Sequence, residues 1–151
     1  MSAPPRLFDR DLLRARLDRA APRYAAADFL KARAAEDAVV RLEAIMRDFP
    51  RAVDLGARNG AFARALARSD AAARVGFLVE ADLSPRMLAG RPGARLAADE
   101  ERLPFAPASL DLVISTLSLH WANDVVGALI QIRLALKPDG LFIGSFLGGA
   151  T

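Results

Sequence analysis

The residues best suited to hold a small ligand stand in the run Val53-Asp54-Leu55-Gly56-Ala57-Arg58-Asn59-Gly60. An apolar stretch ends there in an acid and a turn bracketed by two glycines, and a helical pattern begins directly afterwards. Glycine tolerates positive φ and lets a ligand approach the backbone closely. The start of the following helix favours an anionic group such as a carboxylate. Such a turn also serves as a plain connection between strand and helix, so the motif alone leaves both roles open.

Acidic residues recur farther along the chain at spacings that suit a nucleoside. Asp82 lies about 20 residues beyond Gly60, the spacing at which an acid meets the ribose hydroxyls of a bound nucleoside. The two oxygens of a carboxylate match two vicinal hydroxyls. Asp82 also stands directly before Ser84-Pro85, where it could instead help to begin a helix. Glu80 is an alternative residue for the ribose role.

Two further groups of polar residues follow later apolar runs. Asp99 either accepts a hydrogen from the amino group of adenine or is a loop acid exposed to water. Polar residues from Ser115 to Trp121 follow the next run. Within them, His120 and Trp121 either contact a substrate or pack in the interior.

These residues need a scaffold that brings the ends of several strands together. Short apolar runs alternate with helical stretches after Pro50, which predicts an α/β fold with a parallel sheet wrapped by crossover helices. The predicted strands are 51–55, 75–79, 94–97, 110–115 and 141–146, and the predicted helices are 62–69, 85–89 and 125–136. In open sheets of this type, ligands lie beyond the carboxyl ends of the strands, where strand order reverses. The polar residues described above stand at such ends.

The segment before Pro50 has a different pattern. From Asp9 to about Asp48, apolar residues recur at three- and four-residue steps, which predicts helices. Pro22 is predicted to separate two helices and Pro50 to end the second. We therefore interpret residues 1–50 as a helical cap and 51–151 as the ligand-binding domain. Near the other end, the run Lys137-Pro138-Asp139-Gly140 predicts a turn into the last strand.

Composition narrows the classes of function. A chain of 151 residues, 53% of them hydrophobic and without an apolar stretch of membrane-spanning length, is expected to be a soluble domain with no stable membrane insertion. No cysteine and a single histidine argue against a metal site. The basic residues interleave with acids rather than with stacking aromatics, so no nucleic-acid partner is expected. Acids also stand among the arginines near the start, unlike in a transit segment, so we expect a cytoplasmic protein.

Six segments together carry a family resemblance. They are the 53–60 run, Ala81-Asp82-Leu83-Ser84-Pro85-Arg86-Met87-Leu88, Ala98-Asp99-Glu100, Leu103-Pro104-Phe105, Leu110-Asp111-Leu112-Val113 and Leu136-Lys137-Pro138-Asp139-Gly140-Leu141. In this order the set resembles class I S-adenosylmethionine-dependent methyltransferases. The resemblance implies a Rossmann-like, doubly wound, mostly parallel sheet with strand order 3-2-1-4-5 beneath an N-terminal helical cover. It also implies S-adenosylmethionine as the cofactor.

The resemblance assigns roles to individual residues. Gly56 and Gly60 would surround the methionine end of the cofactor, Asp82 would hold the ribose, and Asp99 with Glu100 would meet the adenine. The implied cofactor-binding set is Asp54, Gly56, Ala57, Arg58, Gly60, Asp82, Leu83, Asp99, Glu100 and Ser115, and the implied substrate-side residues are Tyr24, His120 and Trp121. The family has glycine at the position of Arg58. The arginine side chain would either pair with the methionine carboxylate or block close approach of the cofactor.

Further segments resemble a narrower branch of the family. They include Leu7-Phe8-Asp9-Arg10 and Leu119-His120-Trp121-Ala122-Asn123-Asp124. That branch holds a mitochondrial complex I assembly factor related to arginine hydroxylation and is close to biotin-pathway malonyl-carrier-protein methyltransferases. The resemblance implies methyl transfer to a small-molecule, carrier-bound or protein acceptor. The alternative is a non-methylating S-adenosylmethionine-binding assembly factor, in one form a protein-arginine hydroxylase.

Two expectations concern chemistry and length. Methyl transfer from a sulfonium depends on alignment and exclusion of water more than on a base, so no catalytic residue is assigned.

The family sheet has seven strands, whereas this chain stops soon after its fifth predicted strand. We therefore expect a fragment, a truncated chain, or a dimer that covers the exposed edge of the fifth strand.

Overall fold

Strands and helices alternate along the chain in the computed structural model, which describes residues 5–149. The strands are β1 (Phe49–Leu55), β2 (Val75–Asp82), β3 (Ala94–Ala97), β4 (Leu110–Thr116) and β5 (Leu136–Ser145). The α-helices are α1 (Arg10–Ala20), α2 (Phe29–Glu43), α3 (Ala61–Ala67), α4 (Pro85–Leu88) and α5 (Val125–Ala135). Three 3-10 helices connect them, namely η1 (Ala21–Ala26), η2 (Asp70–Arg74) and η3 (Leu119–Trp121).

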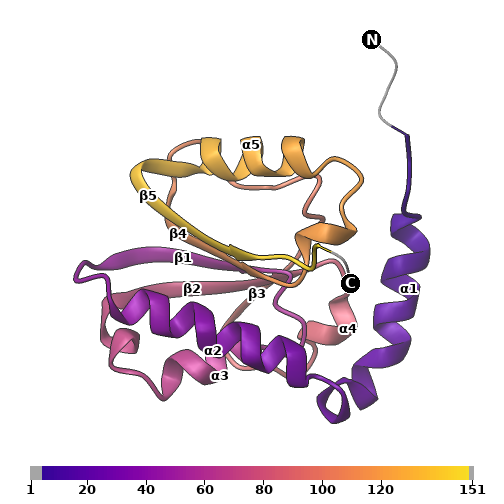
Figure 1. The fold of residues 1–151 in the computed structure, drawn as a ribbon, viewed down its shortest axis with the longest axis horizontal. Helices are drawn as coiled ribbons and strands as arrows, with labels where there is room; N and C mark the ends of the chain where they lie inside the picture. Colours follow the sequence, from indigo (N-terminus) through magenta and orange to yellow (C-terminus); the bar gives the residue numbers. More distant parts are fainter. Residues whose placement is uncertain (1–4, 150–151) are drawn as a thin grey trace.

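The strands form one parallel sheet in the order β3-β2-β1-β4-β5, which confirms the predicted Rossmann-like arrangement. Helices α2 and α3 cover one face of the sheet and α5 covers the other (Figure 1). The chain proceeds outward from β1 to β3 and then returns to β4 on the other side of β1. The carboxyl ends of β1 and β4 therefore flank the point where a ligand crevice is expected.

The core has two halves because successive residues of a strand point to opposite faces of the sheet. Ala52 and Ile114 pack with residues of α2 and α3 on one face. Val53 and Val113 pack with residues of α5, including Ile132, on the other. Every residue of β4 is buried. Packing on both faces fixes where the strand ends lie, and these ends carry the polar residues predicted from the sequence.

Several boundaries differ from the sequence prediction, and two of the differences involve predicted chain breaks. Helix α2 ends at Glu43, and Pro50 is the second residue of β1 rather than the end of a helix. The pairing of β1 with β4 begins only at Ala52, so the missing N–H of Pro50 interrupts no bond on that side. Residues 137–140 do not form a separate turn before the last strand but an irregularity within β5, where the register passes from Leu136 to Leu141 while β4 advances by two residues.

Residues 8–20, which we call the N-terminal arm, run beside the carboxyl ends of the strands (Figure 1). Helix α1 within the arm buries none of its residues. Asp9 caps its start by accepting from the Leu12 backbone N–H over 2.9 Å. The arm is instead held by polar contacts, such as the 2.5 Å hydrogen bond from Ser84 Oγ to Asp18 Oδ1. Among the helices of residues 5–149, none has the length and apolar character needed to cross a membrane.

Candidate functional site

The loop after β1 forms the predicted strand-loop-helix junction. The backbone N–H groups of Gly56 and Ala57 donate to the Ala81 carbonyl over 2.8 and 3.0 Å, which joins the loop to the end of β2. Gly56 and Gly60 have φ values of 75° and 73°. Glycine adopts such conformations at little cost. Helix α3 then begins at Ala61.

At both glycines, the absence of a Cβ atom leaves room for a side chain from elsewhere in the chain. A Cβ atom on Gly56 would lie 2.1 Å from Ser118 Oγ, and a Cβ atom on Gly60 would lie 1.7 Å from Arg91 Nη2. Arg91 in turn pairs with Glu80 over 2.8 Å. The close approach that the sequence analysis attributed to a ligand is thus made here by Ser118 and Arg91. Glu80, the alternative ribose residue, already holds a guanidinium.

Asp82, at the end of β2, is fully buried and bound to Arg58. Its Oδ2 accepts from the Arg58 backbone N–H and from Arg58 Nη1, each over 2.7 Å. Its Oδ1 accepts from the Ser84 backbone N–H over 2.8 Å. Burial alone would lower the pKa of Arg58, but the charges of Asp82 and Glu100 outweigh it and raise that pKa. The acid expected at the ribose is therefore neutralised by an arginine of its own chain.

Asp99 and Glu100, which follow β3, bind a second arginine. Arg10 of the N-terminal arm donates from Nη2 to Asp99 Oδ1 over 2.6 Å and to Glu100 Oε2. Its Nη1 donates to the Trp121 carbonyl over 3.2 Å. Burial would lower the pKa of Arg10, but the Glu100 and Asp99 carboxylates raise it. The arm is thereby fastened to the acids expected at the adenine.

Ser118 connects the two arginine sites. Its hydroxyl donates to Glu100 Oε1 and accepts from Arg58 Nη2 over 3.4 Å. A continuous set of buried polar contacts therefore runs from Arg10 through Glu100 and Ser118 to Arg58. The ends of β2, β3 and β4 are joined by charge-assisted hydrogen bonds, which are stronger than neutral ones.

Lys31 and Asp54 form a second buried charged group, directly beneath the loop. Lys31 Nζ, on α2, donates to the Gly56 carbonyl over 2.6 Å and to the Thr116 carbonyl, so it ties the ends of β1 and β4 together. Burial lowers the pKa of Lys31 to about 8. Burial also raises the pKa of Asp54 to about 6, against the opposing charge of Lys31. Neither carboxylate oxygen of Asp54 finds a hydrogen-bond donor among the described residues.

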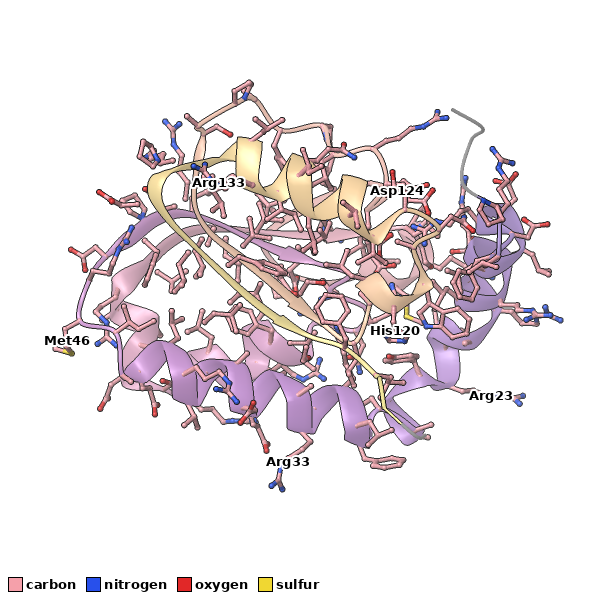
Figure 2. All side chains as sticks on the ribbon, turned by 45° about the horizontal axis from the view of Figure 1, so that its top comes forward. Arg23, Arg33, Met46, His120, Asp124 and Arg133 are labelled. Atoms are coloured by element: carbon pink, nitrogen blue, oxygen red, sulfur yellow. The ribbon has the colours of Figure 1, made fainter. Side chains whose placement is uncertain are left out.

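Of the predicted substrate-side residues, Tyr24 and His120 lie close enough to Arg58 for its charge to affect their pKa, whereas Trp121 lies against the N-terminal arm. Tyr24 is half-buried, and burial raises the pKa of its hydroxyl while the charge of Arg58 opposes the rise. Burial, together with the charges of Arg58 and Lys31, lowers the pKa of His120. Trp121 is 40% exposed and packs edge-on against Phe8, with the ring centroids 5.4 Å apart. Figure 2 shows His120 toward the α1 side of the molecule, with Met46 at the opposite end.

A cavity of about 770 Å³ lies between the arm and the ends of β2 and β3. Its lining includes Phe8, Arg10 and Arg14 of the arm and Leu83, Ala98 and Asp99 of the strand ends. Neither Arg58 nor Asp82 lines it. The cavity thus reaches Asp99, one of the two residues expected at the adenine, but neither Glu100 nor the acid expected at the ribose.

The structure brings together most of the predicted cofactor residues at neighbouring strand ends, with Asp54 to Arg58 at the end of β1, Asp82 and Leu83 at the end of β2, and Asp99 and Glu100 just after β3. Ser115 lies buried near the end of β4, and its hydroxyl finds no partner among the described residues. Arg10, Lys31 and Ser118 belong to the site although no role was predicted for them from the sequence. Within residues 5–149, no group of three His, Cys, Asp or Glu side chains stands close enough to hold a metal ion.

Comparison with known proteins identifies the family of the chain. A model of the methyltransferase domain matches residues 53–144, from β1 into β5. The chain belongs to the methyltransferase-domain family. The matched region contains every strand-end acid described above, and S-adenosylmethionine is the cofactor of methyltransferases of this fold.

Curated relatives of this methyltransferase-domain chain are longer proteins. The chain is 41% identical over 152 residues to the mitochondrial arginine-hydroxylase NDUFAF5 of Homo sapiens, covering 96% of this chain and 43% of that protein. It is 35% identical to the malonyl-[acyl-carrier protein] O-methyltransferase of Methylovorus sp. strain MP688, covering 100% of this chain and 55% of that protein. The chain thus spans about half the length of these relatives.

Solved structures support the same fold. A Haloferax volcanii protein, solved in complex with the Trm112 methyltransferase activator, is 27% identical with a TM-score of 0.70, over 85% of this chain and 58% of that one. An S-adenosylmethionine-dependent methyltransferase from Mesorhizobium loti is 31% identical with a TM-score of 0.58, over 74% and 53% of the two chains. Both agree with the Rossmann-like sheet described above.

Proposed function

We propose that this chain is the cofactor-binding part of an S-adenosylmethionine-dependent methyltransferase that acts on a small-molecule, carrier-bound or protein acceptor. The observation that carries the proposal is the match of residues 53–144 to the methyltransferase domain. The gathering of Gly56, Asp82, Asp99 and Glu100 at neighbouring strand ends supports it. The names of the Methylovorus and Mesorhizobium relatives support the same reaction class.

The residues present suit this cofactor by type and position. Asp82 would accept from the ribose hydroxyls, Asp99 and Glu100 would meet the adenine, and the loop from Asp54 to Gly60 would hold the methionine end, with Leu83 and Ser115 at its sides. The bound cofactor would supply a methyl group on a sulfonium that carries its own leaving group. The task left to the protein is to orient the acceptor and exclude water, which accounts for much of the rate gain in well-oriented systems. Tyr24, His120 and Trp121 would contact the acceptor.

Isothermal titration with S-adenosylhomocysteine tests the proposal. We expect the chain to release heat on binding, and Asp82→Asn to bind roughly tenfold to a hundredfold more weakly, because hydrogen bonds to a charged acceptor contribute about 1.5–3 kcal/mol. Asp37→Asn, at an exposed acid on α2, is the matched control. The absence of binding by both this chain and the full-length gene product would remove the proposal.

A second candidate rests on the relative that is named an arginine-hydroxylase and covers 96% of this chain. In that case the fold would bind the cofactor without transferring its methyl group and would serve an assembly or hydroxylation role. Mass spectrometry of an acceptor after incubation with the full-length protein separates the two. The gain of one methylene group supports methyl transfer, whereas the gain of one oxygen atom supports hydroxylation.

Two further expectations belong to the whole protein. A dimer that covers the free edge of β5 remains our proposal for assembly, since β5 pairs with β4 alone among the described strands. Cytoplasmic residence also remains a proposal, and the human relative is named as mitochondrial.

A further inference from the structure

Arg58 occupies a backbone position that favours glycine. Its φ is 52°, in the left-handed region, between Gly56 and Gly60 with φ values of 75° and 73°. A residue with a Cβ atom is disfavoured there, and bulky residues are uncommon in this region. Such strain persists only where the surrounding structure maintains it, and it is concentrated at functional sites. The contacts of the Arg58 side chain are therefore informative.

The Arg58 side chain is 4% exposed and directed at the acid expected to bind ribose. Asp82 Oδ2 receives both the backbone N–H and Nη1 of Arg58, so one residue supplies two donors to one oxygen. With the Ser84 backbone N–H on Oδ1, these donors take three of the roughly four acceptor positions of the carboxylate, so two vicinal hydroxyls cannot both be accepted. The guanidinium and a ribose therefore cannot both bind Asp82 in this arrangement.

The position of the neighbouring cavity also supports competition between Arg58 and a ribose for Asp82. It is lined by Leu83, Ala98 and Asp99 but by neither Asp82 nor Arg58. A cavity therefore borders the part of the site expected to take the base, although Arg10 binds its acids, whereas the cavity does not reach the acid expected to take the sugar. Arg58 also has a second acceptor within reach, because Nη2 already lies 3.4 Å from Ser118 Oγ.

We propose that Arg58 is an internal competitor for the ribose site, so that an adenosyl ligand binds only when the guanidinium leaves Asp82. This inference rests on the proposed function, because it presumes that the ligand is an adenosyl amino acid. The apparent affinity is then lower than the intrinsic affinity by the fraction of molecules whose Asp82 is free. Arg58 thereby sets the cofactor concentration at which the protein becomes occupied.

Titration of S-adenosylhomocysteine into matched variants tests the inference. We expect Arg58→Gly to bind at least about tenfold more tightly than the wild type. This factor corresponds to a wild type in which Asp82 is free in about a tenth of the molecules or fewer. Arg58→Gln keeps most of the side-chain bulk and removes the charge, so tighter binding by this variant also shows that the ion pair is the obstacle. Arg41→Ala, which breaks an exposed ion pair with Asp37, should bind like the wild type. Far-UV circular dichroism and thermal melting confirm that each variant is folded.

The outcomes separate this inference from the proposed function. Equal or weaker binding by folded Arg58→Gly, with binding by the wild type, overturns the inference and leaves the function in place. Binding by Arg58→Gly alone supports the inference and shows that the wild type does not use the cofactor as it stands. No binding by any variant overturns the inference, and it removes the proposed function as well when the full-length gene product also fails to bind.

The inference can also be tested on the wild type alone, so that this test does not depend on whether a variant folds. The guanidinium NMR signals of Arg58, protected by Asp82, should broaden or shift to solvent-exchanging values when S-adenosylhomocysteine saturates the protein. Retention of the protected signals at saturation would overturn the inference.

Discussion

Asp54 is the acid of this site with the clearest titration behaviour. It is fully buried, and both of its oxygens lack a donor among the described residues. Burial raises its pKa from 3.8 to about 6, and the charge of Lys31 acts in the opposite direction. The charges of Glu80 and Asp82 raise this pKa further, and that of Arg91 lowers it. The folded protein therefore binds a proton at Asp54 more tightly than the unfolded chain does.

We predict that Asp54→Asn changes how stability depends on pH. Because the folded-state pKa is raised, the stabilisation from protonating Asp54 is fully present below 3.8 and is lost as pH rises through about 6. Relative to Asp54→Asn, the wild type should gain about 3 kcal/mol of unfolding free energy as pH falls across this range, since each pKa unit corresponds to about 1.4 kcal/mol. Urea unfolding at a series of pH values measures the difference. A constant difference would show that Asp54 titrates normally.

The acids at the strand ends could be predicted from the sequence, but the basic residues that bind them could not. Asp82, Asp99 and Glu100 were predictable because polar residues at the carboxyl ends of parallel strands meet at one edge of the sheet. That Arg10 would reach two of them depends on where the arm packs, which no local pattern determines. Lys31 could have been noticed, because it falls on the same helical stripe as the buried residues Ala35, Ala38 and Leu42.

Among the elements, the N-terminal arm is held by few contacts, and Arg10 provides several of them. We predict that Arg10→Ala destabilises the protein by about 3 kcal/mol, because it leaves the buried Glu100 carboxylate without its nearest positive charge. Amide hydrogen exchange in residues 8–20 should also become faster. Arg14→Ala, at an exposed arginine on the same helix, is the control. Unchanged exchange in the arm of Arg10→Ala would show that the remaining contacts suffice, among them the pair between Phe8 and Asn123.

The order and type of the elements were largely predictable, whereas some boundaries were not. Strand β3 was predicted with the bounds it has, because the run from Ala94 to Ala97 is closed on one side by Gly93 and on the other by acids. Pro50 was misplaced because the apolar pattern of α2 continues beyond its last residue, through Ile45 and Met46, although Met46 is 83% exposed. Periodicity records which residues could be buried, but the packing against the sheet decides where the helix ends.

The free edge of β5 is the feature of the molecule that bears on assembly. Within residues 5–149 this strand pairs only with β4, and the apolar residues Phe146 and Leu147 that follow it are 42% and 52% exposed. An edge strand offers unpaired N–H and C=O groups to another chain, and exposed apolar side chains beside it favour association.

We predict that this chain forms a dimer through β5 as its concentration rises. Light scattering coupled to size exclusion should then show the mass increase from that of one chain toward that of two. The double substitution Phe146→Lys with Leu147→Lys should keep the protein monomeric, because it replaces the exposed apolar side chains next to the edge with charged ones. Leu134→Lys, at an exposed apolar residue of α5, should dimerise like the wild type. A single-chain mass at every concentration, or a dimer that survives the double substitution, would show that the edge of β5 is not the contact.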